Sequence, residues 1–167
     1  MRRTAWHDRG VTDRDVFILQ RVQPALIGLI DGSLSTIAPI FAVAIATHKP
    51  HVAFLAGLAT AIGAGVSMAF SEGLSDTGEL TGRGRPGMRG AITGLGTFVG
   101  GVLHTLPFLI PRYEVALITA AVVVALELVM LAWIRWRWLE TSFWRSFASI
   151  TLAGAVIAAV AAALGSS

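Results

Sequence analysis

The stretch VQPALIGLIDGSLSTIAPIFAVAIA (residues 22–46) is almost entirely apolar, yet an acidic residue, Asp31, stands near its middle. A helix needs about 20 predominantly apolar residues to cross the ~30 Å hydrocarbon core of a bilayer. Runs of similar length recur along the chain, and 54% of its 167 residues are hydrophobic while only 14% are charged. A soluble domain of this size cannot bury so much apolar surface. We therefore predict an all-α, polytopic membrane protein.

Five membrane-spanning helices account for the apolar runs, and we expect them over residues 22–46, 51–80, 88–110, 115–138 and 147–164. Residues 1–21 are polar and arginine-rich, and form a separate N-terminal segment ahead of a single transmembrane domain, residues 22–167. Thr12 and Asp13 can cap a short amphipathic helix in this segment, on the membrane surface. The first apolar run is too long for a signal peptide and contains Asp31, so we expect it to be retained.

The positions of the basic residues predict the orientation of the helices. Cytoplasmic loops of membrane proteins carry an excess of lysine and arginine. With five helices, eleven of the 13 basic residues fall on the face that holds the N-terminus: Arg2, Arg3, Arg9, Arg14, Arg21, Arg83, Arg85, Arg89, Arg135, Arg137 and Arg145. The N-terminus is therefore predicted to be cytoplasmic and the C-terminus outside. Anionic lipid, rather than nucleic acid, then explains the net charge of +3.

A group of acids follows the second apolar run, in GVSMAFSEGLSDTGELTGRGR (residues 65–85). If the helix continues to residue 80, Met68, Glu72, Asp76 and Glu79 fall within an arc of about 100°. Carboxylate and thioether ligands together suit a borderline divalent metal such as Fe²⁺ or Mn²⁺. This face would lead from the cytosol to Met68 within the membrane.

A simpler interpretation of the same residues is a solvated helix end. Acids at a helix C-terminus face an unfavourable macrodipole and need partners. The following loop offers such partners in Arg83, Arg85 and Arg89. Met68 would then only fill space in the packing.

Three titratable residues are expected at membrane depth. An acid within a membrane segment is costly and indicates function, so Asp31 is predicted to exchange a proton for a cation; the alternative is a structural hydrogen bond. Glu127 is either a proton relay or a protonated structural acid. We expect it at the depth of Asp31, with His104 nearer the outer leaflet, where it either forms a hydrogen bond or binds an ion. His48 and His51 flank an outer turn.

Glycines four residues apart predict close helix contacts. The third predicted helix carries two such pairs, Gly90/Gly94 and Gly96/Gly100. Small residues at this spacing let two helix backbones approach each other in a membrane. The spacing does not tell contacts within the chain from contacts between subunits.

Three motifs, in this order, resemble the vacuolar iron transporter family. GLIDGSLSTIAPIFAVA (residues 28–44) resembles its first helix, GVSMAFSEGLS (65–75) its second and GTFVGGVLHTLPFLIP (96–111) its third. SEGLSDTGELTGRG (71–84) and IRWRW (134–138) are also similar to the membrane half of prokaryotic iron exporters that carry a ferritin-like domain in front. Residues 1–21 contain no Glu-x-x-His motif of such a domain.

The resemblance implies a five-helix homodimer that exchanges Fe²⁺, often Mn²⁺ too, for protons along a path between its subunits. It implies that Asp31 is the proton-coupled acid of this path and that Met68 lines it, and Glu72 matches the family's glutamate. Many eukaryotic members carry a Glu-rich cytosolic domain where this chain has only residues 81–87. Glu72, Asp76 and Glu79 of two subunits would then form the metal-collecting mouth.

We therefore predict proton-coupled export of Fe²⁺ or Mn²⁺ from the cytosol, across a bacterial inner membrane, by a protein that is not an enzyme and holds no cofactor. The predicted metal ligands are Asp31, Met68, Glu72, Asp76 and Glu79, and the predicted proton-coupling residues are Asp31 and Glu127. Three alternatives remain open: a passive channel along the same path, an intramembrane enzyme that uses Asp31, His104 or Glu127, and a non-transporting partner of another protein.

Overall fold

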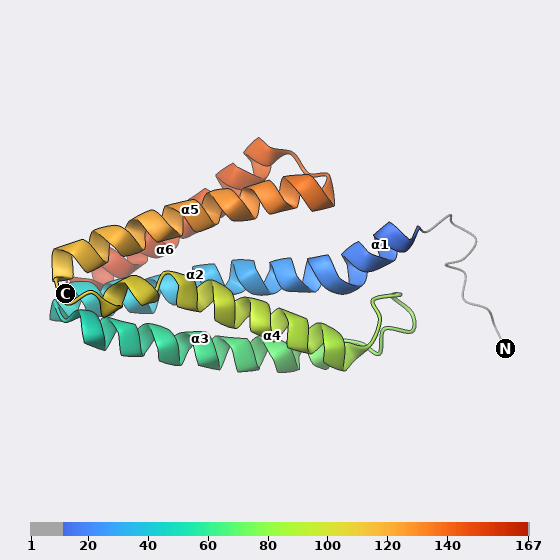
Figure 1. The fold of residues 1–167 in the computed structure, drawn as a ribbon, viewed down its shortest axis with the longest axis horizontal. Helices are drawn as coiled ribbons and strands as arrows, with labels where there is room; N and C mark the ends of the chain where they lie inside the picture. Colours follow the sequence, from blue (N-terminus) through green and yellow to red (C-terminus); the bar gives the residue numbers. More distant parts are fainter. Residues whose placement is uncertain (1–11, 167) are drawn as a thin grey trace.

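The computed structural model describes residues 12–166, of which about 85% are helical and none forms a strand. Part of the predicted N-terminal segment, with Arg2, Arg3 and Arg9, lies outside the described residues. The long helices form two groups that lie side by side (Figure 1). The first group comprises α2 (Gln23–Thr47), α3 (Pro50–Gly73) and α4 (Pro86–Leu103), and the second comprises α5 (Tyr113–Leu139) and α6 (Phe143–Gly165). The described chain begins and ends at opposite ends of this bundle (Figure 1).

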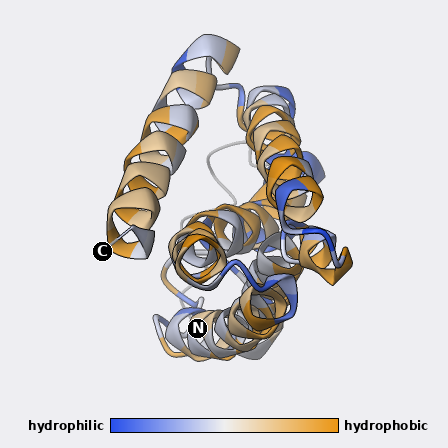
Figure 2. Ribbon diagram, turned by 90° about the vertical axis from the view of Figure 1, so that its left-hand side faces the viewer, coloured by the Kyte–Doolittle hydropathy of each residue, from blue (hydrophilic) through white to orange (hydrophobic). Residues whose placement is uncertain are grey.

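The helices have the length and composition of membrane spans. Four helical stretches of the described chain qualify on both counts, and they contain α2, α3, α5 and α6. The remaining long helix, α4, has 18 residues and is less apolar because it contains several glycines and Arg89. Large hydrophobic side chains face outward, with Phe70 66% exposed and Ile118 65% exposed, and Figure 2 shows hydrophobic colour along the helices. The prediction of an all-helical chain is confirmed, and the described residues contain four to five long apolar helices compatible with a membrane protein.

The N-terminal helix is continuous with the first long helix. Helix α1 (Asp13–Phe17) begins at a capping box: the Thr12 hydroxyl accepts a hydrogen bond from the Asp15 N–H at 3.2 Å, and the Asp15 carboxylate accepts one from the Thr12 N–H at 2.9 Å. A π-helical turn, η2 (Ile18–Val22), joins α1 to α2. Pro24 lies in the first turn of α2 and has no N–H to donate, which interrupts the regular ladder at this point.

Helix α4 packs against α2 and α3 through its glycines. A methyl group added to Gly94 would lie 2.6 Å from the carbonyl oxygen of Gly65 on α3, and one added to Gly100 would lie 2.6 Å from that of Leu29 on α2. From the other side, a methyl group on Gly32 of α2 would overlap the Thr97 carbonyl of α4. The glycine spacing in the sequence therefore marks contacts within the chain, on two faces of one helix.

The predicted ends of two helices were wrong. Helix α3 ends at Gly73 rather than at residue 80, because the Asp76 carboxylate accepts a hydrogen bond from the Gly78 N–H and Gly78 takes a left-handed φ of 80°, which turns the chain. Helix α4 ends at Leu103 rather than at residue 110, and a 3-10 turn, η3 (Leu106–Leu109), follows. Pro107 cannot donate a hydrogen bond to the preceding turn, so the α-helix cannot continue through it.

Two apolar clusters form the core. One joins α2, α3, η3 and α5 around Ile40 and Phe108. The other joins α2, α5 and α6 around Leu26 and Leu131. Along α2, the residues between Leu26 and Ile40 include buried polar side chains as well as glycines.

We expect Gly32→Ala to destabilise the protein, because its methyl group would push α2 away from the backbone of α4. Overpacking of this kind costs about 1–3 kcal/mol. Gly63→Ala on α3 is the matched control, since a methyl group there meets nothing within 4 Å. Thermal unfolding of both variants in the same detergent measures the difference. Equal midpoints for the two variants would contradict the close α2–α4 contact.

Candidate functional site

A chain of three buried polar side chains crosses the bundle. His104 directly follows the last residue of α4 and lies between Thr36 of α2 and Glu127 of α5. Its Nε2 is 2.7 Å from the Thr36 hydroxyl oxygen, and its Nδ1 is 2.9 Å from Glu127 Oε2. Thr36 and His104 are fully buried and Glu127 is 5% exposed.

The hydrogen bonds of this polar triad, Thr36–His104–Glu127, determine where its protons lie. The Thr36 hydroxyl donates to the carbonyl oxygen of Gly32 at 2.7 Å, so it accepts from His104 and Nε2 carries a hydrogen. One further proton then lies between His104 Nδ1 and Glu127 Oε2. Whether it belongs to an imidazolium facing a carboxylate or to a carboxylic acid facing a neutral imidazole, the pair has no net charge. The triad therefore holds one proton that two groups share.

Glu127 has capacity for one more partner. Its Oε1 is buried and accepts no hydrogen bond from the described residues. A buried carboxyl oxygen without a donor is costly, which is why such groups usually have partners. This oxygen is a position at which a further proton, a water molecule or a cation would be stabilised.

His104 directly follows the last residue of α4. A helix that continued to residue 110 would satisfy its own backbone groups. Instead the α-helix stops at Leu103, and the narrower 3-10 turn η3 follows it. Interrupted helices occur within membranes only where protein or a polar cavity surrounds them. We expected His104 at a different depth from Glu127, whereas their side chains are in hydrogen-bond contact at 2.9 Å.

Asp31 lies apart from the triad. It is half-buried on α2, and neither a hydrogen bond nor an ion pair connects it to any other described residue. Asp31 and Thr36 are five residues apart on one helix, so they point about 140° away from each other. The structural hydrogen bond considered as an alternative for Asp31 is therefore not formed within residues 12–166.

The acids at the end of α3 are paired with arginines. Glu72 Oε1 lies 2.6 Å from Arg83 Nη2 and 2.7 Å from Arg89 Nε. Asp76 lies 3.4 Å from Arg83 and 3.3 Å from Arg89. The Arg89 side chain is only 1% exposed, and its guanidinium also donates to the Glu72 carbonyl at the end of α3. Two of the three expected arginines thus balance these charges, while Arg85 does not take part.

The remaining members of the predicted ladder separate from one another. Because α3 ends at Gly73, Asp76 and Glu79 lie in the turn that follows and leave the helical face that carries Met68 and Glu72. Glu79 is exposed and Met68 is half-buried. Within residues 12–166, no three histidine or carboxylate side chains come together as ligands for one metal ion.

The charge of Asp76 is stabilised by its surroundings. Partial burial raises the pKa of this carboxyl, but the Gly78 N–H, the Arg89 charge, the Thr81 hydroxyl and the Arg83 charge outweigh that effect and bring its pKa below the usual value. Asp76 is therefore a carboxylate at any physiological pH.

Sequence reasoning singled out every titratable residue of these two sites and offered the arginines as partners of the acids, but it did not join His104 to Glu127. It placed His104 and Glu127 at different depths, and it did not name Thr36 as a partner. The signal that could have joined them is Pro107, three residues after His104, which ends α4 at that point. His48, in the turn between α2 and α3, lies against the Tyr113 ring, with ring centroids 4.6 Å apart.

Comparison of the chain with models of protein families, with curated proteins and with solved structures finds no match.

We expect Arg89→Ala to be strongly destabilising. It removes a buried cation that contacts Glu72 and Asp76 and leaves the two carboxylates under-compensated, which for a buried pair costs about 3–5 kcal/mol. Arg112→Ala is the control, because Arg112 is exposed in the turn before α5. Detergent-solubilised protein is unfolded by heat or denaturant and followed by circular dichroism. An Arg89→Ala variant as stable as the control would mean that the arginine cluster does not hold α3 to α4.

Proposed function

We propose that the chain is a proton-coupled exporter of divalent metal, Fe²⁺ or Mn²⁺, that works as a homodimer in a bacterial inner membrane with its N-terminus in the cytosol. It would act as a transporter rather than as an enzyme. The observation that carries the proposal is the position of Asp31: a carboxyl group within an apolar helix, unpartnered in the described chain. The resemblance of residues 22–111 to vacuolar iron transporters supports the same proposal.

The surroundings of Asp31 favour a path between subunits. Ile27 and Ser35, one helical turn before and after Asp31, are both exposed, so the other helices of the chain leave this face of α2 uncovered. An isolated carboxylate facing lipid would cost several kcal/mol. A second copy of α2 across a two-fold axis would enclose both Asp31 side chains. Two carboxyls could then exchange two protons for one divalent ion with no change in net charge.

The mouth of the path would use the acids at the end of α3. Glu72 and Asp76 are neutralised by Arg83 and Arg89, so a cation reaches them only if a guanidinium moves away. Arg89 is buried, but Arg83 is 22% exposed and stands between Gly82 and Gly84 in the turn. We propose that the metal displaces Arg83. Glu79 would attract the ion from the cytosol, and Met68, further along α3, would receive it.

The polar triad would supply the return path of protons. His104 and Glu127 share one proton in a neutral pair, and Glu127 Oε1 is a free acceptor beside it. A neutral pair of this kind can take up a proton at one atom and release another without leaving a buried net charge.

A second candidate function has one observation in its favour. A hydroxyl, an imidazole and a carboxylate in a hydrogen-bonded row form the arrangement of nucleophilic hydrolases. Here, however, the Thr36 hydroxyl donates to Gly32, so the imidazole does not accept its proton. All three side chains are also buried, which leaves no approach for a substrate. We therefore favour proton transfer over hydrolysis.

In liposomes that contain a metal-sensitive dye and a pH dye, we expect entry of Fe²⁺ or Mn²⁺ to be coupled to exit of protons. Asp31→Asn should abolish transport, because an amide cannot exchange a proton for a cation. Glu127→Gln should reduce proton movement for the same reason. Asp13→Asn, an exposed acid on α1, is the control. Metal entry without a pH change would indicate a channel, and transport by Asp31→Asn at the wild-type rate would refute the mechanism.

The chain contains no cysteine, so introduced cysteines can map the subunit contact. We expect Ser35→Cys to form a disulfide-linked dimer in oxidised membranes, because it lies beside Asp31 on the uncovered face of α2. Leu126→Cys on α5, 64% exposed, is the control and should remain monomeric. Cross-linking is read on a non-reducing gel. A dimer at position 126 and none at 35 would place the interface elsewhere.

A further inference from the structure

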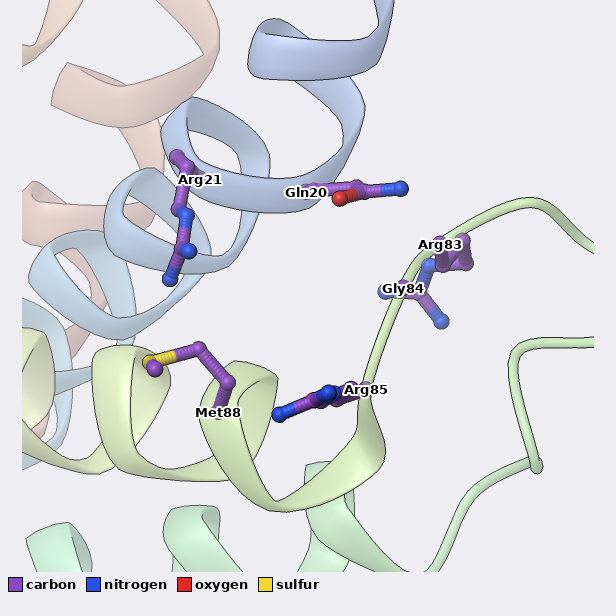
Figure 3. A pocket seen from close by; sticks show the side chains of 6 residues that line it. All are labelled: Gln20, Arg21, Arg83, Gly84, Arg85 and Met88. Atoms are coloured by element: carbon purple, nitrogen blue, oxygen red, sulfur yellow. The ribbon is translucent and has the colours of Figure 1, made fainter.

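A basic pocket lies at the end of the bundle where α1 begins. It is lined by residues from three segments: Gln20 and Arg21 of η2, Arg83, Gly84 and Arg85 of the α3–α4 turn, and Met88 of α4. Figure 3 shows the side chains of Arg21 and Arg85 pointing into the space between η2 and the beginning of α4.

Contacts between η2 and the α3–α4 turn hold the pocket in shape. The Gln20 side-chain amide donates to the Gly82 carbonyl at 3.0 Å, which ties the turn to η2 across a long stretch of sequence. Gly84 has a left-handed φ of 76°, and a methyl group there would lie 2.8 Å from the Gln20 side chain. The wall of the pocket therefore requires glycine at this position, both for its backbone conformation and for space.

The positive charges of the pocket are only partly balanced. Arg83 is paired with Glu72 and Asp76. By contrast, no acidic side chain of the described residues lies within ion-pair distance of Arg21 or Arg85. Helix α4 begins at Pro86, so its free N–H groups and the positive end of its dipole lie beside these guanidinium groups. Several positive groups around one hollow repel one another unless an anion joins them.

We propose that this pocket binds the phosphate group of an anionic phospholipid. Guanidinium groups bind phosphate through paired, charge-assisted hydrogen bonds. The proposal rests on the proposed orientation, in which this end of the bundle faces the cytosol and the anionic headgroups of the inner leaflet. Met88, which is 49% exposed, lines the same pocket and would lie against the acyl chain. A bound lipid would link η2, the turn and α4, and would keep Arg83 close to the acids of the proposed metal mouth.

The test measures lipid binding directly and does not depend on transport. Delipidated protein in detergent is titrated with phosphatidylglycerol, phosphatidylcholine or inorganic phosphate, and binding is followed by native mass spectrometry and thermal stability. We expect phosphatidylglycerol to bind and to raise the unfolding temperature more than phosphatidylcholine does. The double variant Arg21→Ala/Arg85→Ala should weaken this binding about a hundredfold, roughly tenfold for each lost charged donor.

Matched variants distinguish lipid binding in the pocket from a general attraction between the positive protein and anionic lipid. Arg145→Ala removes an exposed arginine near the start of α6, outside the pocket, and should leave binding unchanged. If the double variant fails to fold, Arg21→Lys/Arg85→Lys keeps the charge but loses the planar fork, and should still weaken binding about tenfold. Binding of phosphatidylglycerol but not of inorganic phosphate supports the lipid, while equal effects of both support a phosphate site open to free anions. Equal binding of the two lipids, or binding that neither pocket variant reduces, overturns the proposal.

Discussion

The backbone of α4 lies nearly in contact with the backbones of α2 and α3, and both polar sites depend on that contact. Glycines on two faces of α4 let neighbouring carbonyl groups approach where a single methyl group would collide with them. Van der Waals contact at this range is the main attraction between helices when lipid surrounds them. Because α4 is held on both sides, its first turn brings Arg89 to the acids of α3, and His104, directly after its last residue, reaches Thr36 and Glu127.

The early end of α4 interrupts the ladder of backbone hydrogen bonds at the position of His104. Ending an α-helix within an apolar bundle leaves carbonyl groups without their usual donors, so the surroundings must be polar or well packed. Here the break lies where His104 joins α2 to α5 through two short hydrogen bonds, with an apolar cluster toward each end of the bundle. With the His104 Nε2 hydrogen directed at Thr36, a single proton between His104 and Glu127 leaves the pair without net charge.

The acids at the end of α3 serve stability in the described arrangement, and the proposed metal path would use them differently. A buried arginine holds Glu72 and Asp76 to the beginning of α4, while a partly exposed arginine on a glycine-flanked turn adds a second charge. The two guanidinium groups are therefore unequal: one belongs to the core, and the other lies where a competing cation could displace it. The same turn forms one wall of the basic pocket, so lipid binding and access to the acids would be linked through Arg83.

Composition and periodicity by themselves determined the all-helical class, the approximate span of each long helix and the titratable residues that matter, because apolar length and rare intramembrane charges are properties of single segments. The sequence also indicated close glycine contacts, but only the tertiary structure decided that α4 makes them with α2 and α3 of its own chain. Likewise, the pairing of Glu72 with Arg89 and of His104 with Glu127 depends on where α3 and α4 end. Those ends follow from local turn chemistry, the Asp76–Gly78 hydrogen bond and Pro107, whereas the partners that they bring together lie far apart in the chain. A helical wheel drawn for one segment contains no information about such partners. The prediction therefore carried α3 on to residue 80 and did not pair His104 with Glu127.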